Sequence, residues 1–132
     1  MHEVKRNPNQ SPDPNYGIIE FSHNWNNKLN CTSFTTLRLS NISKYKVGKC
    51  FNVFLKSSKP DDFLFHVKIV DIKTVYYSSI NNYISHLDSG YPPETLKNIL
   101  FKMYSQKTSI NADTMFSFVL FTKVINTQTA QK

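Results

Sequence analysis

The run FLFHVKIVDIKTVYY, from Phe63 to Tyr77, constrains the fold more than any other part of the sequence. Its first half predicts a strand with four apolar residues on one face, namely Phe63, Phe65, Val67 and Ile69. The apolar positions then change parity to Val70 and Ile72. A strand whose buried face changes side needs a bulge or a sharp bend, and small barrels use such bends at their corners. The run therefore predicts one long, bent strand of a small β-barrel.

Other segments predict further strands at 16–22, 33–40, 49–56 and 114–124, with one helical turn near Trp25 and turns at Gly48 and over 57–62. A first helix is expected at 78–87, with Ser78 or Ser79 as its N-cap and an apolar face formed by Ile80, Tyr83, Ile84 and Leu87. A second helix is expected from Pro92, with an apolar face formed by Leu96, Ile99, Leu100, Met103 and Tyr104. This order predicts an α+β fold, a small mixed β-barrel flanked by helices.

A chain of 132 residues fits one domain, which we place at residues 16–125. Residues 1–15 are rich in Pro and Asn and predict a flexible N-terminal tail, and residues 126–132 predict a polar C-terminal tail. No apolar run is long enough for a membrane helix, and the N-terminus lacks the apolar region of a secretory signal. With only Cys31 and Cys50, these features predict a reduced, cytoplasmic protein without membrane association. The spacing of the four histidines matches no metal motif, and no cofactor fingerprint is present, so we expect neither metal nor cofactor.

The net charge of +7 is concentrated in one part of the chain. The segment 21–60 contains no Asp or Glu, but it contains Lys28, Arg38, Lys44, Lys46, Lys49, Lys56 and Lys59. Outside this segment the positive and negative residues balance. Concentrated positive charge attracts polyanions such as RNA more strongly than the same charge spread out. The alternative is a set of solvated lysines with no ligand.

The motifs FTTLRL, KYKVGK, VKIVDIKTV and LDSGY, in this order and spacing, resemble the ASCH domains of the PUA-like superfamily. The resemblance covers residues 16–124 and is closest to the small versions found in bacteria and their phages. It implies a compact PUA-like β-barrel with flanking helices. It also implies binding of RNA or a modified nucleotide in a cleft beside the barrel.

A few members of this family hydrolyse acylated cytidine with a Lys-x-x-Thr-x-Arg motif and a distant Glu. The resemblance places the Thr at Thr36 and the Arg at Arg38, but Ser33 stands where those enzymes have lysine. A hydroxyl cannot replace an amine without a change of chemistry, which argues against the family's catalysis here. Lys28 could reach the same space.

Arg38 is the first candidate for binding an anion, because its guanidinium can donate two hydrogen bonds to a phosphate or a base edge. It could instead be a surface arginine or an internal partner of Asp71 or Asp88. Thr35 and Thr36 could donate to the same anion, although strand propensity also explains them.

Lys28, Lys44 and Lys46 could bind phosphates, or each could simply be solvated. Trp25 and Tyr91 could stack on a base, and a single Trp could equally belong to the core.

The leading hypothesis from the sequence is a non-catalytic module that binds RNA or a nucleotide beside the Thr36–Arg38 strand. One alternative is a small amidohydrolase acting on a modified nucleoside, with Lys28, Thr36 and Glu20 as catalytic groups. Another is a protein-interaction module of a phage or mobile element.

Overall fold

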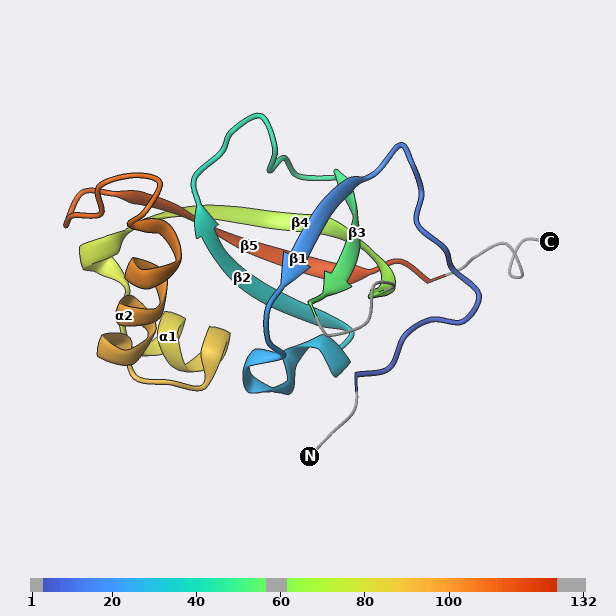
Figure 1. The fold of residues 1–132 in the computed structure, drawn as a ribbon, viewed down its shortest axis with the longest axis horizontal. Coiled ribbons are helices and arrows are strands. Elements are labelled where there is room, and N and C mark those ends of the chain that lie inside the picture. Colours follow the sequence, from blue (N-terminus) through green and yellow to red (C-terminus); the bar gives the residue numbers. More distant parts are fainter. Residues whose placement is uncertain (1–3, 57–61, 126–132) are drawn as a thin grey trace.

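The computed structural model describes residues 4–56 and 62–125. Five strands form one sheet in the order β1-β3-β4-β5-β2, in which β1 pairs with β3 in parallel and the other pairs are antiparallel. Their bounds are Gly17–Phe21 (β1), Ser33–Leu39 (β2), Cys50–Leu55 (β3), Phe63–Tyr76 (β4) and Met115–Lys123 (β5). The sheet curves into a half-barrel, with β1 and β2 in front of β4 and β5 in Figure 1. The two edge strands approach each other closely enough for the Phe21 and Phe34 rings to lie 5.9 Å apart.

The long strand β4 confirms the prediction made from its change of parity. Its register with β5 shifts between Ile69 and Asp71, so Val70 has no partner in the ladder and is 46% exposed. A bulge of this kind turns the following residues to the other face and bends the strand. The first half of β4 therefore packs inside the barrel, and Val75 packs in the second core cluster beside the helices.

Two α-helices, α1 (Asn82–Ser89) and α2 (Pro93–Tyr104), cover one end of the sheet (Figure 1). Short 3₁₀ segments are also present: η1 (Trp25–Asn30) connects β1 to β2, and η2 (Tyr77–Ser79) connects β4 to α1. The predicted helix is present as α2, with Leu96 and Leu100 buried, but Met103 of its predicted apolar face is 44% exposed. The predicted turn at Gly48 is also present, and its φ of 90° is a conformation that glycine adopts without strain. None of the helices in the described part of the chain is long and apolar enough to cross a membrane.

Helix α1 corrects two predictions. Its N-cap is Asn81, whose side chain accepts a hydrogen bond from the Ile84 N–H at 2.9 Å, and not Ser78 or Ser79. Of the predicted apolar face, Tyr83 and Leu87 are 79% and 70% exposed. The helix instead buries its polar side, formed by Ser85, Asp88 and Ser89.

Hydrogen bonds explain why this polar side can be buried. The Ser85 hydroxyl donates to the Tyr91 carbonyl at 2.6 Å, and the Ser89 hydroxyl donates to the Ser85 carbonyl at 2.8 Å. Asp88 accepts hydrogen bonds from Lys28 and Thr35. Buried polar groups cost little when they are paired in this way, so the pairing of these groups overrides the helical periodicity of the apolar residues.

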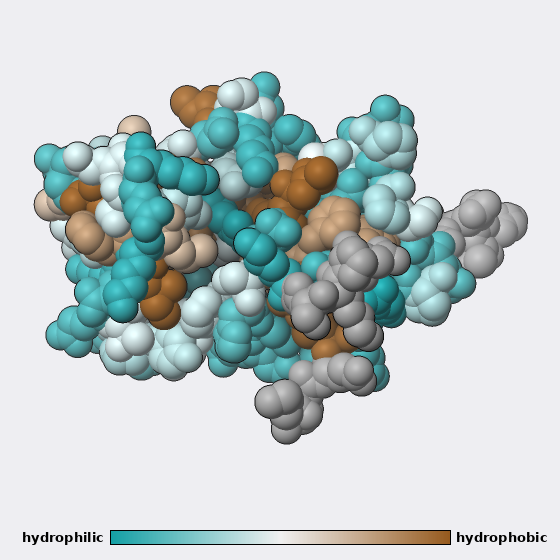
Figure 2. Space-filling model, viewed as in Figure 1, coloured by the Kyte–Doolittle hydropathy of each residue, from teal (hydrophilic) through white to brown (hydrophobic). Residues whose placement is uncertain are grey.

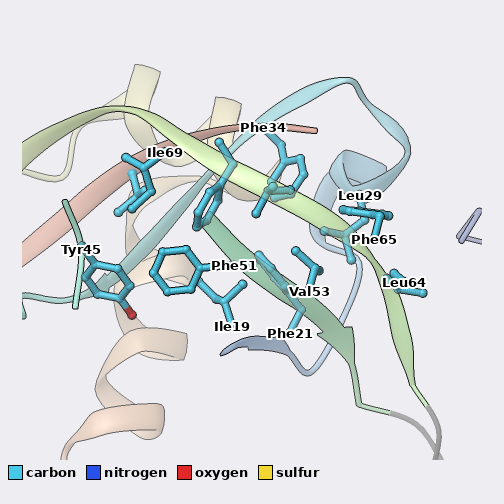
Figure 3. Packing of buried hydrophobic residues seen from close by; sticks show 13 residues of the cluster. Ile19, Phe21, Leu29, Phe34, Tyr45, Phe51, Val53, Leu64, Phe65 and Ile69 are labelled. Atoms are coloured by element: carbon cyan, nitrogen blue, oxygen red, sulfur yellow. The ribbon is translucent and has the colours of Figure 1, made fainter. Parts of the chain in front are cut away.

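The hydrophobic core consists of two clusters. The larger fills the half-barrel, where Phe51 lies among Tyr45, Ile19 and Val53 and the rings of Phe34 and Phe65 pack nearby (Figure 3). The smaller lies between the helices and the adjoining end of the sheet and contains Leu37, Val75, Ile80, Leu96, Leu100 and Phe116. On the outside, the face shown in Figure 2 is mostly hydrophilic, with hydrophobic side chains in separate patches.

Residues 4–15 lie against the strands through side chains that imitate strand pairing. The Asp13 N–H donates to Asn52 Oδ1 at 2.9 Å, and Asn52 Nδ2 donates back to the Asp13 carbonyl at 3.0 Å. Gln10 joins the strands in the same manner, accepting from the His66 N–H at 2.9 Å and donating to the Val124 carbonyl at 2.8 Å. The prediction of a tail over residues 1–15 did not include these contacts. The predicted turn at 57–62 falls mostly, and the C-terminal tail at 126–132 wholly, outside the described residues.

Candidate nucleic-acid interface

A narrow cleft lies where the edge strands β1 and β2 meet η1, α1 and α2. It is lined by strand residues Glu20, Phe21, Thr36 and Arg38, by Trp25 and Lys28 of η1, by Asp88 and Ser89 of α1, and by Leu96, Ile99, Leu100 and Met103 of α2. Its cavity volume of about 40 Å³ is room for two or three water molecules. A nucleobase does not fit inside this cleft, so only a small group of a larger ligand could enter it.

The position of Lys28 follows from the asparagines around it. Asn26 and Asn27 adopt left-handed backbone conformations, with φ of 56° at both, which Asn tolerates better than most residues. Asn24 fixes the end of the turn, because its Oδ1 accepts a hydrogen bond from the Leu29 N–H at 2.8 Å. The chain therefore turns twice within η1 and buries Lys28 and Leu29.

Lys28 is held in a buried ion pair. Its ammonium lies 3.1 Å from Asp88 Oδ1, and both side chains are 6% exposed. The Thr35 hydroxyl donates to the same oxygen at 2.8 Å. Burial lowers the pKa of Lys28, and the attraction of Asp88 opposes that shift. The pair joins η1 and β2 to α1, and Lys28 is not available to a phosphate while the pair is intact.

Arg38 differs from Lys28, because no acidic side chain in the described part of the chain neutralises its charge. Its Nε donates to Thr36 Oγ1 at 3.0 Å, its Nη2 donates to the Glu20 carbonyl at 2.9 Å, and its guanidinium lies 4.7 Å from the centre of the Phe21 ring. These partners are uncharged, and the described residues place no carboxylate within salt-bridge distance of the guanidinium. The suggested pairing of Arg38 with Asp71 or Asp88 is therefore wrong. Arg38 instead bridges the two edge strands of the half-barrel.

The positive charge of Arg38 extends to the loop between β2 and β3. The pKa of Lys44 is lowered first by burial and then by the nearby charges of Arg38 and Lys49. The charges of Arg38 and Lys49 therefore both act on the ammonium of Lys44. We call Arg38, Lys44 and Lys49 the basic cluster. Lys49 has a second neighbour in the ring of Phe51, 5.4 Å from its ammonium.

The candidate stacking residues lie together at the edge of the cleft. The rings of Trp25 and Tyr91 are 6.0 Å apart in an edge-to-face arrangement, and the His23 ring is 4.6 Å from Trp25. Trp25 is half-buried and belongs to neither core cluster, so the suggestion that the single Trp is a core residue is wrong. Tyr91 is 38% exposed.

The structure thus brings four of the predicted site residues, Trp25, Lys28, Thr36 and Arg38, into one cleft together with Glu20. Thr35 contacts the cleft indirectly, through Asp88. Lys44 lies outside it in the basic cluster, and Lys46 is exposed on the same loop. The sequence reasoning did not identify the Lys28–Asp88 pair, because residues so far apart in the chain share no local pattern.

Among the described residues, no group of three or more His, Cys, Asp or Glu side chains could hold a metal ion. Comparison of the chain with protein-family models, curated proteins and solved structures finds no match. The ASCH assignment therefore stays a prediction from the motifs quoted above.

Proposed function

We propose that this protein binds RNA across the mouth of the cleft, without catalysis, as a PUA-like module of the ASCH type. The observation that carries the proposal is Arg38, a half-buried guanidinium that is oriented by neutral acceptors and flanked by two further cations. Cations that repel one another are held together at a cost in stability, and an anionic ligand removes that cost.

The size of the cleft decides how the RNA would lie. A strand placed across the mouth sets its phosphates beside the basic cluster and Lys46, and one base on the Trp25 ring. Stacking of a base on an aromatic ring contributes about 1–3 kcal/mol and tolerates any base. Only a phosphate oxygen or a carbonyl would reach inward to Arg38. The excess of positive charge over residues 21–60 and the resemblance to ASCH domains support the same ligand.

Replacing Arg38 by alanine is expected to weaken binding of a fluorescein-labelled oligouridylate by about tenfold or more, because a hydrogen bond to a charged group contributes about 1.5–3 kcal/mol. Fluorescence anisotropy at low salt measures the affinity. Arg38→Lys keeps the positive charge but not the planar guanidinium, so it should retain only part of the wild-type affinity. Lys107→Ala, which removes an exposed charge beyond α2, is the matched control and should bind like the wild type. Wild-type protein that binds no RNA at low salt would exclude the proposal.

The second candidate, an amidohydrolase acting on an acylated nucleoside, is favoured by one specific observation. An amine, two threonine hydroxyls and a carboxylate meet around Lys28, Thr35, Thr36 and Asp88. Burial lowers the pKa of Lys28, which increases the share of neutral amine that can accept a proton. The acid in this group is Asp88 and not Glu20, whose backbone carbonyl is the part bonded to Arg38.

This second candidate predicts that the protein hydrolyses N4-acetylcytidine. Chromatography of the released cytidine measures the rate. Thr36→Val should then lower the rate by about a hundredfold or more if the hydroxyl takes part in the reaction, and Lys28→Ala should do the same. The control is Ser43→Ala, which removes a hydroxyl from the exposed loop outside the cleft. Absence of turnover by the wild type under all buffer conditions tested removes this candidate and leaves the binding proposal intact.

A further inference from the structure

A second basic site lies at the opposite end of the half-barrel from the helices. It is a groove between the N-terminal segment and the end of β5, with a cavity volume of about 270 Å³. Its lining includes three cations, Lys5, Arg6 and Lys123, together with Phe65, and the described residues contribute no carboxylate to it. In Figure 1 this region, where the N-terminal segment passes the end of β5, lies far from α1 and α2. The groove is therefore a positively charged hollow separate from the cleft.

The groove is built by defined contacts. The Lys5 N–H donates to Asn30 Oδ1 at 3.0 Å and the Asn7 N–H donates to the Leu64 carbonyl at 2.8 Å, so backbone bonds fix the segment that carries Lys5 and Arg6. The Lys123 ammonium lies 4.3 Å from the centre of the Phe65 ring, at the end of the barrel core. Burial lowers the pKa of Lys123, so its charge is only partly hydrated. A partly dehydrated cation over an aromatic ring binds an anion at less desolvation cost than a free surface lysine does.

The strand register relates the groove to the basic cluster. Arg38 pairs with Ser117, Phe34 pairs with Phe121, and the Lys123 N–H donates to the Thr32 carbonyl at 2.9 Å. Because alternate residues of a strand share a face, Arg38 and Lys123 lie on the same side of the sheet as Phe34 and Phe121, at its two ends. The buried core fills that side between them, so an RNA strand that joins the two sites has to pass over the outside of η1. The six steps along the chain from Thr32 to Arg38 span about 20 Å at about 3.3 Å per residue. That length corresponds to about six phosphates of a stacked strand at about 3.4 Å each.

We propose that this groove, formed by Lys5, Arg6 and Lys123, is a second phosphate-binding site that holds the same RNA strand as the basic cluster. The inference rests on the proposed function and extends it to a minimum length of RNA. The segment η1 lies between the two sites, since Lys28 lines the cleft and Asn30 holds the backbone of Lys5. A strand that reaches both sites gains affinity because the second contact is intramolecular, and a shorter strand gains nothing from it.

The test compares two fluorescein-labelled oligouridylates, one of about 3 and one of about 12 nucleotides, within the range of single-stranded binding sites. The variant Lys5→Ala/Arg6→Ala/Lys123→Gln should bind the longer one about tenfold or more weakly and with a smaller salt dependence, while the shorter one binds within about twofold of the wild type. Because the groove is fixed by backbone hydrogen bonds of residues 5 and 7, these side-chain changes leave its frame in place. Urea unfolding of each variant checks this.

A matched control removes three exposed charges elsewhere, in Lys73→Ala/Lys102→Ala/Lys107→Ala. If the groove variant binds the longer RNA as tightly as the wild type while Arg38→Ala still weakens it, the second site is wrong and the proposed function stands. The same conclusion follows if the control triple weakens binding as much as the groove variant. If wild-type protein binds neither oligonucleotide at low salt, both proposals are wrong.

Discussion

Replacing Asp88 by alanine is expected to lower the free energy of unfolding by about 3–5 kcal/mol, because it leaves the buried ammonium of Lys28 without a counter-charge. The ion pair is the one salt bridge that the structure shows between described residues, and both of its side chains are 6% exposed. The change also removes the acceptor of the half-buried Thr35 hydroxyl, so a second donor loses its partner at the same time. Urea denaturation followed by circular dichroism measures the loss.

Two further variants distinguish the effect of breaking the ion pair from the effect of removing any carboxylate. Asp113→Ala removes an exposed carboxylate and should change stability by less than about 0.5 kcal/mol. The double variant Lys28→Met/Asp88→Leu replaces both charges by apolar groups and should be much more stable than Asp88→Ala alone, since neither charge is then left unpaired. A loss of less than about 1 kcal/mol in Asp88→Ala would mean that Lys28 finds water or another partner.

The course of the sheet was predictable because its signals are local. The change of parity between Ile69 and Val70 located the bulge in β4, and the turn at Gly48 needed a positive φ that glycine supplies. The start of α2 at two prolines and its apolar spacing likewise depend on neighbouring residues only. Such features follow from propensity and periodicity, so one sequence is enough to find them.

The orientation of α1 was not predictable in this way. Its apolar residues follow helical spacing, yet Tyr83 and Leu87 face solvent and Asp88 is buried. The reason lies outside the helix, in Lys28 and Thr35, which are 60 and 53 residues away along the chain. A partner at that distance supplies no periodic signal, although it decides which face of a short helix is buried.

In the candidate site, too, the local features were predictable from the sequence and the long-range contacts were not. Thr36 and Arg38 came from a short motif within one strand, and the structure joins them directly through the Arg38 Nε–H and Thr36 Oγ1. Lys5 and Arg6 were assigned to a tail because their neighbours are Pro and Asn, residues typical of flexible segments. What places them in a groove is their contact with Asn30 and with the end of β5, which composition does not reveal.

The lysines of the β2–β3 loop should account for most of the salt dependence of RNA binding. We expect the triple variant Lys44→Ala/Lys46→Ala/Lys49→Ala to bind oligouridylate about a hundredfold more weakly than the wild type at about 0.1 M salt, because each phosphate contact to a single strand contributes about 0.7 to the slope of log K against log salt. The slope itself should fall by about 2. Anisotropy titrations at several salt concentrations give both quantities.

The form of the salt dependence distinguishes a loss of phosphate contacts from a loss of structure. If the three lysines act only through phosphates, the affinities of the variant and the wild type should converge towards about 1 M salt, where the counterion effect vanishes. Partial unfolding would instead weaken binding equally at every salt concentration. The triple variant Lys73→Ala/Lys102→Ala/Lys107→Ala changes the net charge by the same amount and should keep the wild-type slope. Equal slopes in the two triple variants would show that RNA senses the overall charge of the protein and not the cations around Arg38.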